Sequence, residues 1–175
     1  TGWTERVIAS NAVYDYYSVA VGDLDADGDP DVAANTFAAG ELNWYENLDG
    51  LAGTWLTHTV AISVLSIKDV LVAPISPDAA PDIAASMAND EDIRWWRNQN
   101  GTGTNFIALP VSNNIDDVTG LDLGDINRDG SVDLVAALYT GNRLAWFNRL
   151  GGAGGSNWTI TIIATNYSSP ADVVA

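Results

Sequence analysis

The chain has 175 residues, of which 47% are hydrophobic; this composition excludes a disordered acidic tail and is enough for one sizeable core. Its 23 Asp and Glu residues outnumber seven Lys and Arg, and the formal net charge of −16 at pH 7 argues against nucleic acid or an anionic membrane as a partner and favours divalent cations. No apolar run approaches the roughly 18 to 20 residues that cross a bilayer, so we expect no membrane insertion.

The first predicted element is an aromatic residue followed by alternating Thr and aliphatic residues. This alternation is typical of a strand with one exposed face. Four copies occur along the chain: WTERVIA (3–9), WLTHTVA (55–61), FIALPV (106–111) and WTITIIA (158–164). We expect each copy to form the outer strand of a small sheet.

The next element is an apolar strand that runs through a turn into a second strand. It occurs three times at a constant offset of 51 residues: VGDLDADGDPDVAAN (21–35), VAPISPDAAPDIAAS (72–86) and LGDINRDGSVDLVAA (123–137). The Ala-Ala pair after each turn is small enough to let neighbouring sheets approach closely. The constant offset indicates a repeat protein.

An aromatic strand closes each unit at the same offset, and its three copies are NWYEN (43–47), RWWRN (94–98) and AWFNR (145–149). Consecutive strand residues point to opposite faces. One ring of each aromatic pair is therefore expected to face one neighbouring sheet, and the other ring the opposite sheet, as inter-sheet core. The alternative is an aromatic platform for a sugar.

These elements predict an all-β fold, a β-propeller segment of about three and a half four-stranded blades. Residues 1–175 then form a single segment, whose repeats run approximately over 1–52, 53–103, 104–154 and 155–175, the last being the start of a fourth. A β-sandwich with accidental internal similarity is the alternative.

The first turn, DLDADGDPD (23–31), carries five carboxylates in nine residues, at positions 1, 3, 5, 7 and 9 of the turn. Gly28 stands at position 6, where a positive φ is easily adopted. Oxygen ligands on alternate residues around such a bend suit a cation that takes six to eight oxygens. The candidate metal ligands are Asp23, Asp25, Asp27, Asp29 and Asp31.

The third turn, DINRDGSVD (125–133), keeps this pattern with fewer charges, and Gly130 again stands at position 6. Its candidate metal ligands are Asp125, Asn127, Asp129, Ser131 and Asp133. In both turns we expect side chains at positions 1, 3, 5 and 9 to coordinate, together with the backbone carbonyl of Asp29 or Ser131. The side chain of Asp29 would then not be a ligand.

Calcium is the expected ion in both turns, because magnesium prefers a rigid octahedron and keeps its waters. The spacing also resembles the first half of an EF-hand loop, which needs a Glu at position 12 and flanking helices. Position 12 is Ala34 in the first turn and Ala136 in the third, and both turns have strand-like flanks. The EF-hand is therefore excluded.

The second turn, PISPDAAPD (74–82), retains only Asp78 and Asp82 together with Ser76. Pro74 replaces the first ligand, and no glycine stands at position 6. We expect no calcium here, and we expect prolines to restrict the backbone in its place.

GDLDADGDPDVAA and GDINRDGSVDLVAA, each followed by a strand such as LNWYENLDG, resemble the FG-GAP/VCBS repeat. The resemblance covers essentially the whole chain. It implies a propeller, often seven-bladed, of the kind found in integrin α-subunit heads and in secreted or cell-surface proteins, with calcium in the first and third turns. The FG and GAP tripeptides are not visible, so an integrin-like partner is not implied.

Three and a half blades do not close a ring, and an open ring leaves sheet edges exposed. The expected partners therefore include other blades of a longer chain, which we favour, or a second copy of this chain. Nucleic acid is not among the expected partners.

Catalysis is not expected, because the chain has no Cys, one histidine and carboxylate pairs only inside the turns. His58 lies in an alternating strand and is expected at the sheet surface. Catalytic residues on blades outside the chain remain an alternative.

Four arginines surround two of the aromatic strands, namely Arg94, Arg97, Arg143 and Arg149. We expect cross-strand ion pairs with Glu91 and Asp92, and an acidic partner is the alternative. Sequons at Asn100, Asn157 and Asn166 predict glycans if the protein is secreted by a eukaryote.

The sequence thus predicts a calcium-stabilised propeller scaffold of an extracellular or cell-surface protein, which binds a protein or carbohydrate ligand in adhesion. The alternatives are part of a polysaccharide-processing propeller of the lyase or hydrolase type, and an assembly subunit that closes a ring by oligomerisation.

Overall fold

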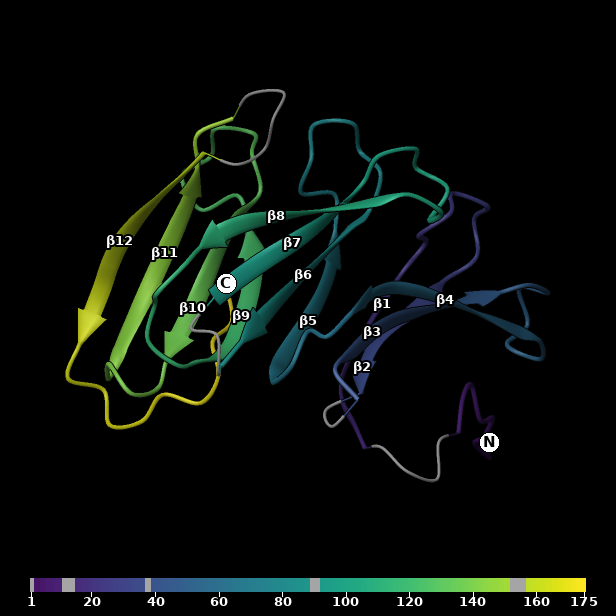
Figure 1. Cartoon of the computed structure of the whole chain (residues 1–175). Coiled ribbons are helices and arrows are strands. Elements are labelled where there is room, and N and C mark those ends of the chain that lie inside the picture. The colour runs from purple at the N-terminus through teal and green to yellow at the C-terminus, as the bar shows by residue number, and fades with distance from the viewer. Residues whose placement is uncertain (1, 11–14, 37–38, 89–91, 152–156) are drawn as a thin grey trace.

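The computed structural model describes residues 2–10, 15–36, 39–88, 92–151 and 157–175. These residues form three separate four-stranded antiparallel sheets (Figure 1). No helix in these ranges is long and apolar enough to cross a membrane. The predicted all-β fold is confirmed, and the three sheets have the form of propeller blades.

Each sheet is built from four strands consecutive in sequence, which lie side by side in chain order. The first sheet contains β1 (Tyr16–Gly22), β2 (Asp31–Thr36), β3 (Glu41–Asn47) and β4 (Trp55–Ile62). The second contains β5 (Ile67–Ala73), β6 (Asp82–Met87), β7 (Asp92–Asn98) and β8 (Phe106–Ser112). The third contains β9 (Val118–Gly124), β10 (Asp133–Leu138), β11 (Arg143–Arg149) and β12 (Trp158–Thr165).

The outer strands pair differently from the expected order within each unit. Each outer strand pairs with the aromatic strand that precedes it, as β4 does with β3, β8 with β7 and β12 with β11. The sheets are therefore offset from the sequence repeats. The strand expected at residues 3–9 does not form: this segment pairs with no strand of the three sheets, and Trp3 is fully exposed.

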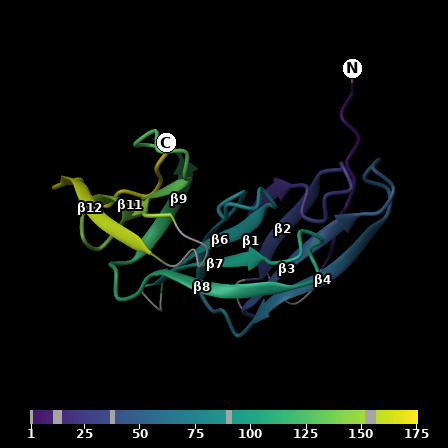
Figure 2. The same ribbon diagram turned by 90° about the horizontal axis from the view of Figure 1, so that it is seen from above.

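The three sheets lie next to one another in an open arc, seen from above in Figure 2. The first strands of the sheets, β1, β5 and β9, are neighbours at the inside of this arc. Asp69 on β5 joins all three, because its carboxylate accepts hydrogen bonds from Ser18 Oγ on β1 (3.1 Å) and from Leu121 N on β9 (2.9 Å). The sheets do not close into a ring.

The core consists of two layers, one between each pair of neighbouring sheets. On β7, Trp96 packs in the layer toward the first sheet, and Trp95 packs in the layer toward the third. This confirms the predicted alternation of the aromatic pairs for the middle blade. Ala84 and Ala85 on β6 alternate between the two layers in the same way, and both are completely buried.

A hydrogen bond also joins the first two sheets at their rim. The indole N–H of Trp44 donates to the carbonyl oxygen of Gly103 at 3.0 Å. Gly103 has a φ of 65°, and a Cβ added there would lie 2.4 Å from the Trp44 ring. Only glycine fits this close approach.

Candidate metal centres in the acidic turns

The three turns lie at equivalent places, each joining the first strand of a sheet to the second. The aspartate at the end of each turn, Asp31, Asp82 or Asp133, is buried. Its Oδ1 accepts a hydrogen bond from the backbone N–H sixteen residues later, at Asn47 (2.9 Å), Asn98 (2.8 Å) or Arg149 (3.0 Å). This buried aspartate therefore fixes the turn to the third strand in every sheet, whether or not the turn has metal-ligand spacing.

In the first turn, Asp23, Asp25 and Asp27 converge, and one oxygen from each lies within 4.8 Å of the others. Asp23 accepts hydrogen bonds from the N–H groups of Asp27 (3.1 Å) and Gly28 (3.1 Å). Ala26 and Gly28 have φ values of 65° and 98°, which curl the chain around the carboxylates. The turn thus holds three anionic side chains together with no cationic side chain hydrogen-bonded to them among the described residues.

The electrostatics of the first turn follow from this crowding. Partial burial, followed by the charges of neighbouring carboxylates, raises the pKa of Asp25. Burial likewise raises the pKa of Asp31, against the effect of its hydrogen bonds from Asn47 and Leu24. Holding these groups ionised at neutral pH costs free energy, which a bound cation would offset.

The remaining two candidate ligands of the first turn point elsewhere. The carboxylate of Asp31 faces inward and accepts the N–H of Leu24 on Oδ2 at 2.8 Å. The side chain of Asp29 lies against Gly50, where an added Cβ would meet its Oδ2 at 2.4 Å. Asp29 is not among the three carboxylates that converge, and coordination by its backbone carbonyl stays a prediction.

The third turn repeats the backbone of the first. Arg128 and Gly130 have φ values of 63° and 84°, at the positions of Ala26 and Gly28. Asp125 accepts hydrogen bonds from Asp129 N (3.0 Å) and Gly130 N (3.0 Å), which matches the bonding of Asp23. The two turns with metal-ligand spacing therefore share one conformation.

The side chains of the third turn differ from those of the first in charge. A hydrogen bond from the amide of Asn127 at 2.8 Å, aided by that of Ser131 N, lowers the pKa of Asp129. Asp133 Oδ2 is buried and has no hydrogen-bond partner, whereas Asp31 Oδ2 has one. An unpartnered buried carboxylate oxygen at a predicted ligand position is the donor that a cation needs.

The second turn neutralises its charge with a side chain. Arg97 Nη2 on β7 donates to Asp78 Oδ2 at 2.8 Å, and Ser76 Oγ donates to Asp78 Oδ1 at 2.6 Å. Although burial alone raises it, these bonds lower the pKa of Asp78 overall. An arginine head group thus stands at the acidic turn that lacks metal-ligand spacing.

The residue that faces each turn from the third strand was missed by the sequence analysis. It is Glu46 in the first sheet, Arg97 in the second and Asn148 in the third. The charge of Glu46 contributes to the raised pKa of Asp25, and Asn148 Oδ1 accepts a hydrogen bond from Asn127 at 3.2 Å. The signal was present in the sequence, since the three positions are 51 residues apart and differ in charge.

The side chain of His58, on β4, contacts two other side chains. Its Nε2 is 2.6 Å from Glu46 Oε2, and its ring stacks on Trp44 with centroids 4.3 Å apart. The predicted surface position on a strand is correct, although the side chain is only 26% exposed.

The other predicted features lie as follows. Arg94 pairs at 2.8 Å with the expected partner Asp92, but both lie on β7, so this ion pair is within one strand and not across strands. Arg143 pairs with Asp116, and Glu91 lies outside the described residues. The pairing of Arg97 with Asp78 corrects the expectation of a cross-strand partner. The three sequon asparagines, Asn100, Asn157 and Asn166, are exposed.

Comparison with known families gives one match. Residues 75–136 match the FG-GAP-like repeat, a stretch that begins in the second turn and ends in β10. No curated protein matches the chain. The match includes the second and third turns and all strands between them, and it confirms the resemblance seen in the sequence. Residues 75–136 are therefore similar to the FG-GAP-like repeat, within a chain of three propeller-like sheets.

Proposed function

We propose that this propeller segment is a calcium-stabilised scaffold of a secreted or cell-surface protein, which presents its surface to a protein or carbohydrate ligand and does not catalyse a reaction. The observation that carries the proposal is the shared geometry of the first and third turns. Both curl the backbone at the same two positions, and in both the first aspartate accepts the N–H groups of the fifth and sixth residues of the turn.

The second turn supports the assignment of a cation to the other two. Where the ligand spacing is lost, an arginine side chain pairs with the acidic group. Where the spacing is kept, the facing residue is Glu46 or Asn148, and neither brings positive charge. Calcium in the first and third turns would supply the charge that Arg97 supplies in the second.

The proposed location follows from the affinity expected of such turns. Extracellular calcium modules bind with dissociation constants on the order of 0.1 to 1 mM, which suits calcium outside cells. The exposed positions of Asn100, Asn157 and Asn166 suit glycosylation there.

A non-catalytic role is supported by the contacts of the titratable groups. His58 stacks on an indole and contacts Glu46, and clustered carboxylates lie in the turns proposed to hold calcium. Ligand binding by loops on a rigid scaffold uses none of these groups as acid or base.

A second role, ring closure with further blades or with a second copy, is favoured by the outward face of the first sheet. Val19, Val70 and Leu121 occupy the same position in the three sheets, but Val19 is 62% exposed whereas the other two are 1% and 3% exposed. Val70 and Leu121 pack on the preceding sheet. Val19 therefore belongs to an inter-blade face without its neighbour.

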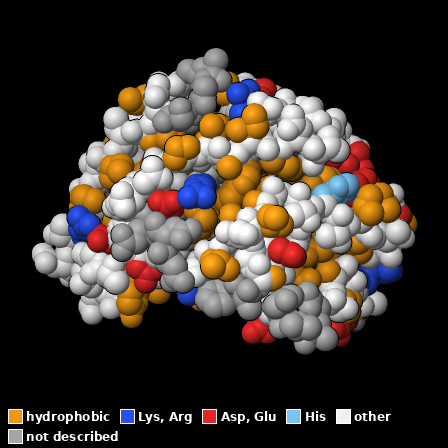
Figure 3. All heavy atoms as spheres, viewed as in Figure 1, with side chains coloured by type: hydrophobic (Ala, Val, Ile, Leu, Met, Phe, Trp, Pro, Cys, Tyr) orange, Lys and Arg blue, Asp and Glu red, His pale blue; other side chains and the backbone are white. Residues whose placement is uncertain are grey.

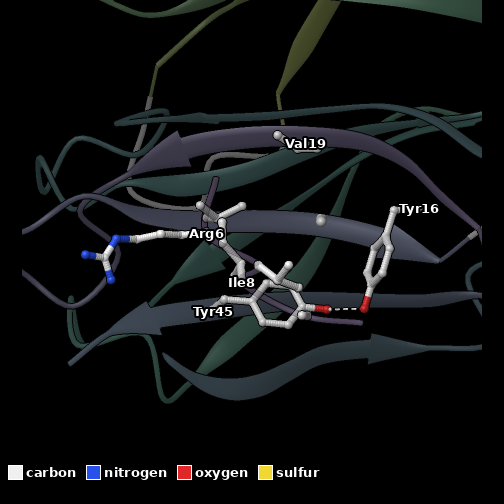
Figure 4. A pocket seen from close by; sticks show the side chains of 9 residues that line it. Arg6, Ile8, Tyr16, Val19 and Tyr45 are labelled. Atoms are coloured by element: carbon white, nitrogen blue, oxygen red, sulfur yellow. Dashed lines mark hydrogen bonds between the residues drawn. The ribbon is translucent and has the colours of Figure 1, made fainter. Parts of the chain in front are cut away.

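Figure 4 shows this face, where Tyr45 donates a hydrogen bond to Tyr16 (3.3 Å) and Ile8 and Arg6 lie near Tyr45. An apolar hollow of about 230 Å³ opens between these residues. In Figure 3, hydrophobic side chains also gather on the surface beside the histidine and across the middle of the view. A patch of this kind marks an interaction surface.

Thermal unfolding with millimolar calcium and with excess EDTA tests the calcium proposal. We expect calcium to raise the unfolding temperature of the wild-type chain, less for Asp25→Ala and Asn127→Ala, and not at all for the double variant. Asp78→Ala is the matched control and should keep the full rise. No difference between calcium and EDTA in the wild type would refute a structural calcium.

Native mass at increasing protein concentration tests ring closure by a second copy. A dimer that Val19→Glu abolishes would support it. A monomer at every concentration would contradict closure by copies and leave further blades as the partner of this face.

A further inference from the structure

Arg149 departs from its repeat. The equivalent residues in the first two sheets are Asn47 and Asn98, whose amides are fully used. Asn98 donates to Leu24 O (2.8 Å) and accepts from Gly103 N (3.2 Å), and Asn47 accepts from Ala52 N (3.1 Å). In the first two sheets this position holds an asparagine whose amide hydrogen-bonds backbone groups of the adjoining loops. In the third sheet the longer, positively charged Arg149 stands in its place.

The guanidinium of Arg149 is buried and keeps unused hydrogen-bond donors, although its charge contributes to the lowered pKa of Asp129 in the third turn. The residue is only 5% exposed, and its Nε and Nη1 have no hydrogen-bond acceptor. Its side chain forms no ion pair in the part of the chain that the structure describes. Burying an arginine with unused N–H groups carries the desolvation penalty of an unpaired buried ion, so an acceptor is expected at this place.

Arg149 lines a groove between the second and third sheets. The second turn contributes Pro74, Ser76, Pro77 and Ala79 to this groove, and the third contributes Gly130, Ser131 and Val132. None of these lining residues carries a negative charge. Arg149 is thus the charged group of a mixed polar and apolar groove that contains hydroxyl and backbone groups.

We propose that this groove is a binding site for a carboxylate group, received by the guanidinium of Arg149. A guanidinium offers five N–H donors in a planar fork that matches the two oxygens of a carboxylate. Ser76 and Ser131 line the two walls of the same groove, and the Ser76 hydroxyl, which donates to Asp78, keeps its acceptor capacity for a ligand that is also hydroxylated. A small carboxylic acid, either a simple one or a sugar acid, has this chemistry.

The negative charge of the chain does not prevent such binding, because charges farther than about 8 Å are screened at physiological ionic strength. The site also differs from the proposed calcium centres in the sign of its ligand. The two sites are nevertheless neighbours, since Ser131 lines the groove and Arg149 N donates to Asp133 Oδ1 (3.0 Å), and titrations in EDTA and in calcium distinguish failure of one proposal from failure of the other.

Arginine Nε–Hε resonances, recorded by NMR on the whole chain at constant ionic strength, report directly on the site. The probes are sodium acetate, sodium glucuronate and the neutral sugar glucose, each titrated in EDTA and in calcium. We expect saturable shifts of the Arg149 resonance with one or both carboxylates and none with glucose. Saturation by acetate identifies a simple carboxylate as sufficient, and saturation by glucuronate alone identifies a sugar acid.

Arg149→Asn introduces the residue found at this position in the other two repeats, so we expect the variant to fold. Its unfolding temperature tests this expectation. We expect carboxylate binding to be at least tenfold weaker in Arg149→Asn and unchanged in the control Arg94→Asn. Because the Arg149 side-chain resonance is lost in the first variant, the backbone amide resonances of Gly130 and Ser131 report binding there. No saturable shift in the wild type, or equal binding in Arg149→Asn, would overturn the proposal.

Discussion

The first and second acidic turns occupy the same place in neighbouring sheets and differ in how their charge is treated. The first gathers Asp23, Asp25 and Asp27 under a further carboxylate, Glu46. The second keeps Asp78 beside Arg97. Turns at the same place in neighbouring sheets thus relieve carboxylate repulsion in two ways, with a side-chain cation or, as we propose, with a metal ion.

What the two turns share is equally informative. Asp31 and Asp82 are both buried, and both accept two backbone N–H groups from the turn and the third strand. This arrangement does not depend on the ligand spacing, since it survives in the second turn. The last aspartate of the turn is thus a structural residue first and a candidate ligand second.

The largest expected effect comes from removing this shared aspartate. Asp82→Ala leaves the buried N–H groups of Ser76 and Asn98 without acceptors, and we expect a loss of about 2–4 kcal/mol in the free energy of unfolding. Asp78→Ala, in the same turn, breaks only a partly exposed ion pair and should cost less than about 1 kcal/mol. Urea unfolding in EDTA measures both, and equal losses would show that the buried aspartate has no special role.

A charge exchange at the facing residue should convert the first turn toward the second. Glu46→Arg places a cation beside the carboxylates, and we expect calcium affinity to fall roughly tenfold while stability in EDTA rises. Calorimetric titration with calcium checks the affinity. Glu41→Arg changes the same charge at the far end of β3 and should leave calcium binding almost unchanged. A similar loss in both variants would mean that net charge, and not the facing position, matters.

A smaller effect is expected from pH, because the two carboxyls of the second turn shift in opposite directions. Burial raises the pKa of Asp82, so its ionisation disfavours folding at neutral pH, and this cost disappears as the pH falls through the raised pKa toward 3.8. The pKa of Asp78 is lowered, so its contribution is present above 3.8 and is lost as the pH falls through the lowered pKa.

In EDTA, the difference in stability between the wild type and Asp78→Asn should therefore be constant above pH 3.8 and shrink below it. The difference between the wild type and Asp82→Asn should change above pH 3.8. Chemical unfolding at a series of pH values separates the two. Parallel curves for all three chains would contradict the opposite shifts.

The sequence predicted the features that depend on local pattern. A period of 51 residues and the alternation at Trp95 and Trp96 were sufficient for the blade-like sheets and their two-sided core. The curled backbone of the two ligand-spaced turns followed from Gly28 and Gly130.

The contacts between strands were not predictable in the same way. The pairing of the outer strand with the preceding unit depends on hydrogen bonding across the repeat boundary. The alternation of polar and apolar residues predicts a strand but does not predict its partner. The approach of Arg97 to Asp78 joins residues 19 positions apart, and the burial of Arg149 depends on a neighbouring sheet. These are properties of the assembled sheets and not of any segment.

The pairing of each outer strand with the preceding repeat determines where this chain can be shortened or rearranged without losing a strand from a sheet. A cut at a repeat boundary near residue 53 would remove β4 from the first sheet. β3 would then be an exposed edge strand, whose unpaired backbone groups can pair with other molecules. Cuts at residues 63–66 or 113–117 fall between sheets and keep every strand with its partner. The outer strand of each sequence repeat belongs to the sheet of the preceding repeat. Separating two successive repeats therefore requires breaking the backbone hydrogen bonds of one strand pair as well as the packing between two sheets.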